Sequence, residues 1–201
     1  MRVLAPVAVH EERVLRMQVP CEGRALAPQR VADCQGKIPM TNPPEILVLG
    51  VGNTLYTDEG LGVRAVEQLS SSYNFSDNVT VFDGGTLGMK LMDHIVKYDK
   101  LIVVDAVLCG DEAGSIYRLV GEDLRKSLGF NNSMHQTDLV DTLIFCELIG
   151  NRPDTVVIGM EPSDYATMNL NLSSEVACKL DSMCDIVLQE ITESGGKFFV
   201  K

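Results

Sequence analysis

Four carboxylates and one imidazole are spaced along the sequence so that they could form a single site. The acids follow or end three successive apolar runs of the chain: Asp58 and Glu59, then Asp83, then Asp105. The carboxyl ends of parallel strands meet at one edge of a sheet, where ligand sites gather. His135 could join them from the end of a polar stretch. Carboxylates with one imidazole form a partial ligand shell for a divalent ion such as Ni²⁺ or Zn²⁺.

Each of these residues also has a purely structural interpretation. Asp58 and Glu59 could complement the positive end of a helix dipole. The two later acids, Asp83 and Asp105, could accept backbone N–H bonds in neighbouring loops, and His135 could be a loop or capping residue. The combination favours a site, because core packing does not by itself bring strand-end acids to one histidine.

Other catalytic motifs are absent from the sequence. It contains neither a G-x-S-x-G elbow nor an H-E-x-x-H helix. The six cysteines form no C-x-x-C pair, so we interpret them as free thiols of a reducing compartment. Cys109 lies four residues past Asp105 and is interpreted as a passive loop thiol. If the protein is a hydrolase, a metal must do most of the activation.

The glycines after the first apolar run match only part of a dinucleotide-binding fingerprint. Gly50 and Gly52 are present, but Leu55 stands where the fingerprint needs a third small residue. A nucleotide-binding α/β enzyme is therefore a less favoured alternative.

The elements that would position these residues alternate along the chain. Buried strands are predicted at 46–51, 79–83, 101–105 and 155–159, with an edge strand at 115–120. Helical spacing of apolar residues predicts helices from near 58 to 69, at 87–95, from near 137 to 144 and at 173–191, with Thr57 as an N-cap. This alternation predicts an α/β fold whose mostly parallel sheet is covered on both sides.

Charge and proline content separate an N-terminal segment from an acidic body. Residues 1–40 carry six basic and four acidic side chains, against eleven and 24 in residues 41–201, and six of the eight prolines precede Glu45. We interpret 1–44 as a flexible N-terminal extension and 45–201 as a single domain. Met40 would make a natural start, so 1–39 could be a mis-assigned extension.

The overall composition excludes several classes of protein. The chain has 201 residues, 45% apolar content and a net charge of −11, which argues against disorder and against binding of phosphate backbones. No apolar run approaches the roughly 18 residues of a membrane span, and the apolar start is too short for a secretory signal. We expect a cytoplasmic monomer without nucleic-acid or membrane partners.

Residues 47–64, with the sequence LVLGVGNTLYTDEGLGVR, closely resemble the opening of the hydrogenase maturation proteases. The resemblance covers about residues 45–193 and continues in the same order through DGGTLG at 83–88, LIVVDA at 101–106, GSI at 114–116, MHQ at 134–136 and VIGMEP at 157–162. Five further motifs in the right order are far more specific than any single one.

The resemblance implies a three-layer α/β sandwich with a twisted, mostly parallel five-stranded sheet. It also implies an aspartic-type endopeptidase that removes the C-terminal extension of a nickel-loaded hydrogenase large-subunit precursor. The family's metal-binding Glu, Asp and His correspond to Glu59, Asp105 and His135, which would complete the coordination of nickel presented by the substrate. Asp83 or Asp58 would act as general base.

Under this interpretation nickel is recognised in the substrate and need not be held by the free enzyme. A nickel-binding docking module or chaperone without peptidase activity would carry the same ligands, and is the main alternative.

Overall fold

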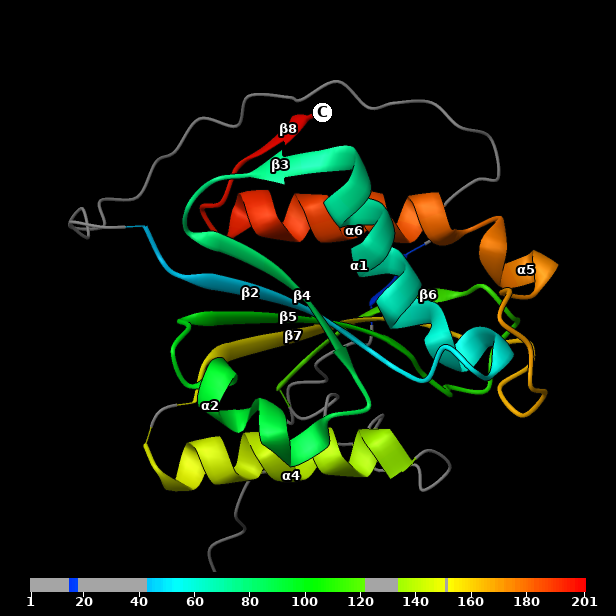
Figure 1. Cartoon of the computed structure of the whole chain (residues 1–201), viewed down its shortest axis with the longest axis horizontal. Helices are drawn as coiled ribbons and strands as arrows, with labels where there is room; N and C mark the ends of the chain where they lie inside the picture. The colour runs from blue at the N-terminus through cyan, green and yellow to red at the C-terminus, as the bar shows by residue number, and fades with distance from the viewer. Residues whose placement is uncertain (1–14, 18–42, 122–133, 151) are drawn as a thin grey trace, which may run out of the picture.

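The structure is a computed structural model of the chain, shown in Figure 1. It describes residues 15–17, 43–121, 134–150 and 152–201; within these ranges, the side chains of 15–17 and 134–140 are not described. No helix in the described ranges is long and apolar enough to cross a membrane.

The main sheet has six strands in the order β1-β6-β7-β5-β2-β4. Its strands are Leu15–Met17 (β1), Ile46–Val51 (β2), Val79–Gly85 (β4), Lys100–Ala106 (β5), Ile116–Val120 (β6) and Asp154–Met160 (β7). Strands β4, β2, β5 and β7 run parallel, whereas β6 is antiparallel to β7. A separate two-stranded sheet joins β3 (Tyr73–Phe75) to β8 (Phe198–Val200), near the C-terminus.

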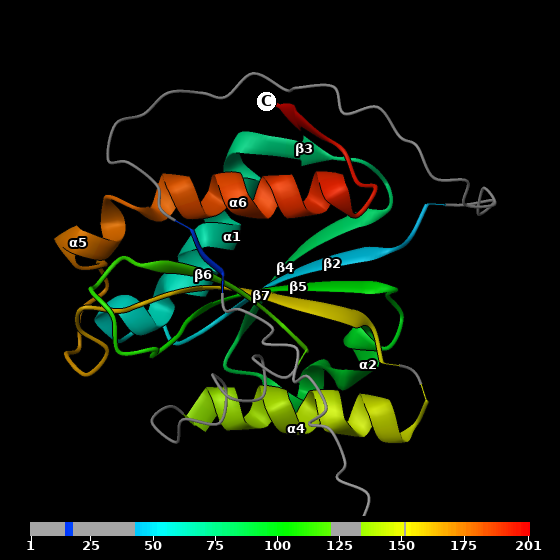
Figure 2. The same ribbon diagram turned by 180° about the vertical axis from the view of Figure 1, so that it is seen from behind.

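Helices cover both faces of the main sheet. They are η1 (Thr57–Gly60), α1 (Leu61–Ser72), η2 (Gly88–Leu91), α2 (Met92–Ile95), α4 (Met134–Leu148), α5 (Ser174–Ala177) and α6 (Leu180–Glu193). Figures 1 and 2 show α1 and α6 on one face, with α2 and α4 on the other. The α/β sandwich with a mostly parallel sheet is therefore confirmed.

The continuous apolar runs form the central strands because both of their faces are buried. In β2, Ile46 and Val48 pack into the core beneath α1 and α6, whereas Leu47 and Leu49 pack into the core beside α2. Successive side chains of a strand point to opposite faces, so a strand between two helical layers needs apolar residues at every position.

The edge position predicted for 115–120 is wrong. Strand β1, from the N-terminal segment, pairs antiparallel with β6 and places Leu15 opposite Arg118. Three residues are too few to show a strand period in the sequence, which is why the segment gave no signal. Residues 1–14 and 18–42 lie outside the described residues, so the domain boundary at residue 45 stays a prediction.

Three of the predicted helices differ in detail from the structure. The segment 173–191 forms two helices, because the Lys179 N–H bonds to the Val176 carbonyl (3.0 Å) and tightens the chain between α5 and α6. The helix predicted near 137 begins at Met134, and Ile144 on it is 43% exposed. The segment 87–95, predicted as one helix, forms the short pair η2 and α2.

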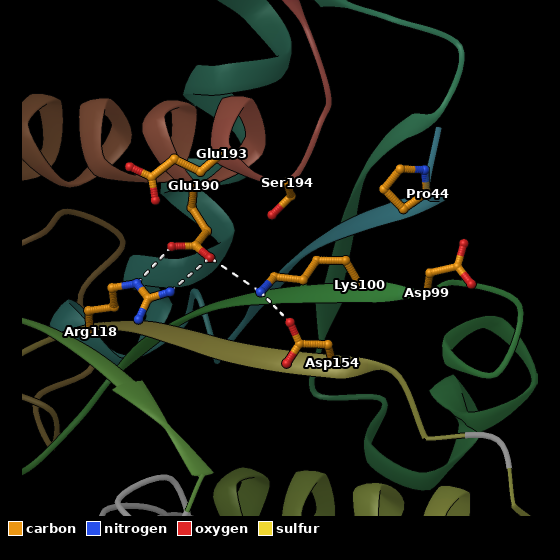
Figure 3. Close-up of a pocket in the computed structure, with 8 residues that line it drawn as sticks. All are labelled: Pro44, Asp99, Lys100, Arg118, Asp154, Glu190, Glu193 and Ser194. Atoms are coloured by element: carbon orange, nitrogen blue, oxygen red, sulfur yellow. Dashed lines mark hydrogen bonds and ion pairs between the residues drawn. The ribbon is translucent and has the colours of Figure 1, made fainter. Parts of the chain in front are cut away.

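A charged pocket lies at the amino ends of β5 and β7, shown in Figure 3. It is lined by Pro44, Asp99, Lys100, Arg118, Asp154, Glu190, Glu193 and Ser194. The Glu190 side chain, only 5% exposed, accepts two bonds from the Arg118 guanidinium (2.8 and 3.1 Å) and pairs with Lys100 at 3.3 Å. This cluster ties α6 to the sheet, on β5 and β6.

Glu190→Gln is expected to lower the free energy of unfolding by about 2 kcal/mol, because it leaves the half-buried Arg118 guanidinium without its carboxylate and leaves Lys100 with Asp154 alone of its two acidic partners. Burial raises the pKa of Glu190, but Arg118 and then Lys100 outweigh it and hold the pKa below 4.5. The stability difference between variant and wild type should therefore have its full size above pH 4.5. It should disappear as the pH falls through the folded-state pKa of Glu190.

Urea unfolding at several pH values measures this effect. Glu193→Gln, an exposed position on the same helix and pocket, is the matched control and should change stability by less than about 0.5 kcal/mol. Equal effects of the two substitutions would contradict a structural role for the Glu190 cluster.

Candidate active site

The loop between β2 and α1 places Glu59 against the carboxyl end of β5. Gly52 has a φ of +134°, and a Cβ there would lie 1.9 Å from the Glu59 carbonyl oxygen. Gly62 presses equally closely, because its Cβ would lie 2.1 Å from the Val104 carbonyl oxygen. A side chain at Gly52 would push η1 away from the end of β2, and one at Gly62 would push α1 away from β5. The two glycines therefore hold η1, which contains Glu59, close to both strands.

Asp105 and Asp83 lie at the carboxyl edge, as predicted. Asp105, the penultimate residue of β5, is 5% exposed, and its Oδ1 accepts the Ala106 N–H at 2.8 Å. Asp83 of β4 lies opposite Gly50 of β2. It is exposed and accepts the Gly85 N–H at 2.9 Å. Each acid therefore accepts a backbone N–H hydrogen bond, as the purely structural interpretation expects, and also lies near the carboxyl end of its strand.

His135 is the second residue of α4. Figure 1 shows that α4 begins on the same side of the molecule as η1 and the carboxyl ends of β2 and β5. The side chain of His135 is not among those that the structure describes. Among the described residues, no group of three or more His, Cys, Asp or Glu residues could hold a metal ion. The start of α4 thus lies on the same side of the molecule as the first loop, and the assignment of Glu59, Asp105 and His135 as metal ligands stays a prediction.

Asp58 lies in a different environment from the other acids. Its side chain is fully buried and accepts four hydrogen bonds of 2.7–2.9 Å: from the backbone N–H groups of Ser163, Asp164 and Ser173, and from the Ser173 hydroxyl. All of the donors lie in the segment after β7. Asp58 therefore joins the first loop to this distant segment and fixes the backbone next to Glu59.

Thr57 has a similar joining role and is not the N-cap predicted for it. It lies within η1, and its hydroxyl donates to the Thr167 carbonyl at 2.9 Å. The backbone N–H of Thr57 donates to the same carbonyl at 3.1 Å.

Asp58→Asn is expected to lower the free energy of unfolding by roughly 3 kcal/mol. The amide carries no charge, and its NH2 group would face backbone N–H groups that now donate to the carboxylate. Thermal unfolding and peptidase activity should be measured together. Asp93→Asn, on the exposed side of α2, is the control and should leave both unchanged. A variant with wild-type stability and no activity would instead favour a chemical role for Asp58.

Glu161 is a buried acid that was not singled out from the sequence. It follows β7 and accepts the Cys109 N–H at 2.7 Å, the Gly110 N–H at 3.2 Å and the Tyr117 hydroxyl at 3.3 Å. The carboxylate thereby holds the loop that follows Asp105. The sequence did offer a signal for Glu161, because it directly follows a predicted strand, as the other candidate acids follow or end theirs.

The Cys109 thiol on this loop is poorly suited to be a nucleophile. Burial, followed by the nearby carboxylates of Glu161 and Asp111, raises its pKa to about 11. The reactive form of cysteine is the thiolate, which is scarce at neutral pH for such a group.

Comparison with known proteins identifies the family. The family model described as hydrogenase maturation protease matches residues 63–190. The chain belongs to the hydrogenase maturation protease family. Hydrogenase expression/formation protein HupD of Thiocapsa roseopersicina is 35% identical over 158 residues, which is 78% of this chain and 72% of that protein. Hydrogenase 2 maturation protease of Escherichia coli K12 is 35% identical over 152 residues, 75% of this chain and 92% of that protein.

A solved structure agrees with this assignment. The hydrogenase maturating endopeptidase HybD from E. coli superposes with a TM-score of 0.75 at 33% identity, covering 78% of this chain and 98% of HybD. This hydrogenase maturation protease is therefore a peptidase, which confirms the enzyme class expected from the resemblance and leaves the nucleotide-binding alternative without support.

Proposed function

We propose that this protein removes the C-terminal extension of a nickel-loaded hydrogenase large-subunit precursor. Membership of the hydrogenase maturation protease family supports the reaction. The observation that carries the assignment to a site is that η1, which contains Glu59, packs against β5, whose penultimate residue is Asp105.

The nickel ion is cargo of the substrate in this proposal. Glu59, Asp105 and His135 supply two carboxylates and an imidazole, which suit a nickel ion whose other ligands are thiolates of the precursor. Binding the ion docks the C-terminal peptide in one register and polarises the scissile carbonyl.

Asp83 is the better of the two candidates for general base. Its carboxylate is exposed at the edge, where it can take a proton from a water molecule that attacks the scissile carbonyl carbon. The peptide C–N bond then breaks, and the leaving nitrogen receives the proton. Asp58, fully buried under four donors, would have to give up those bonds to reach water, so we assign it to positioning. With an aspartate as the general base, the enzyme would be an aspartic-type peptidase.

We further propose a cytoplasmic monomer. The four described cysteines, Cys109, Cys146, Cys178 and Cys184, are free thiols, which suits a reducing compartment.

Incubation of the protein with nickel-loaded precursor tests the function. Mass spectrometry should detect the released C-terminal peptide and the shortened large subunit. An uncut precursor would overturn the proposal, and binding without cleavage would identify a docking module.

A further inference from the structure

Strand β4 forms the open edge of the main sheet. It pairs with β2 on one side only, whereas β1 covers β6 at the opposite end of the sheet. Within the described residues, no strand pairs with the outer side of β4. The main-chain N–H and C=O groups directed to that side can therefore bond to an added strand.

This edge lacks the features that usually protect an open strand. Natural edges are short, or carry lysine, proline or bulges. Strand β4 spans seven residues, as many as β5 and β7, and its sequence VTVFDGG contains neither lysine nor proline. The register irregularity with β2 occurs only at its end, after Asp83. Residues 80–82 are half-buried, unlike the buried residues of β2.

The direction of β4 leads an added strand into the candidate site. Asp83 lies opposite Gly50, and the Gly85 carbonyl accepts the Gly52 N–H at 2.9 Å. The strand thus ends at the loop that carries Glu59. A peptide paired with 79–83 would have its next residues beside Asp83 and that loop.

We propose that the outer edge of β4 binds the precursor segment next to the scissile bond as an extended strand. The occupant is the substrate of the proposed reaction, so the inference rests on the proposed function. Strand addition uses main-chain hydrogen bonds, which depend little on the substrate's side chains. Register along the edge then comes from the docked nickel ion, and affinity comes from the backbone.

Amide hydrogen exchange, read by mass spectrometry, tests this edge. The Asp83→Asn variant keeps the three proposed metal ligands and should bind nickel-loaded precursor without cutting it. Adding the precursor should slow exchange of the outward amides of 80–83 by roughly tenfold or more, because each is then protected by a hydrogen bond. The Val79 N–H is left out of this comparison because it already donates to the Ser76 carbonyl at 2.9 Å. Amides of 116–118 in β6, which is covered on both sides by β1 and β7, are the internal control and should not change.

Wild-type protein is assayed for cleavage of the same precursor in parallel. Cleavage without protection at 80–83 would overturn strand addition and leave the proposed function standing. Absence of cleavage would overturn both. Protection at 80–83 that appears without precursor and grows with protein concentration would show a second copy of the chain on this edge, which also contradicts the proposal.

Discussion

Glu59→Gln and Asp105→Asn are each expected to lower kcat/KM for precursor processing by about a hundredfold or more, because a misplaced ion misplaces the scissile bond. A neutral amide oxygen is a weaker ligand than a carboxylate and removes one negative charge facing the cation. His135→Ala should give a loss of the same size by removing the imidazole. Processing is measured as the initial rate of peptide release from nickel-loaded precursor.

Matched substitutions separate chemistry from folding. Glu67→Gln makes the same chemical change on the exposed side of α1, where Glu67 pairs with Arg64 at 2.9 Å. Asp99→Asn does so at the opposite end of β5, where Asp99 accepts the Glu45 N–H. Both controls should retain wild-type rates, and circular dichroism should show native structure in every variant. Wild-type processing by Glu59→Gln and Asp105→Asn would refute the metal assignment.

Nickel-free precursor is expected to stay uncut under conditions in which the loaded precursor is processed completely. Without the cation, Glu59 and Asp105 have no charge to bind on the substrate, and nothing sets the register that brings the scissile bond to Asp83. Gel electrophoresis resolves the two forms by the lost C-terminal peptide. Equal cleavage of both precursors would eliminate nickel recognition while preserving the peptidase assignment.

A chelator experiment locates the ion. Enzyme treated with a chelator and then freed of it should process nickel-loaded precursor at the untreated rate, because the ion arrives with the substrate. Loss of activity, restored by adding nickel to the enzyme alone, would place the ion on the protease as a resident cofactor.

The fold was predictable where a local pattern determines it. Continuous apolar runs such as 46–51 and 101–105 predicted buried strands, because each side chain in them packs against one of two helical layers. Strand β1 was not predictable, because three residues carry no period and their partner is β6, about a hundred residues further along the chain. Pairing of β3 with β8 likewise joins segments more than 120 residues apart.

The roles of the acids show the same division. The sequence by itself determined that Asp58, Glu59, Asp83 and Asp105 follow or end strands, since strand ends are set by local hydrophobicity. Only the tertiary structure separated Asp58 from the others, because its donors lie 105–115 residues further along the chain. Hydrogen bonds over such separations depend on how loops meet at the sheet edge, and no spacing in the sequence encodes that meeting. The same long-range packing left Asp83 exposed and β4 open beside it.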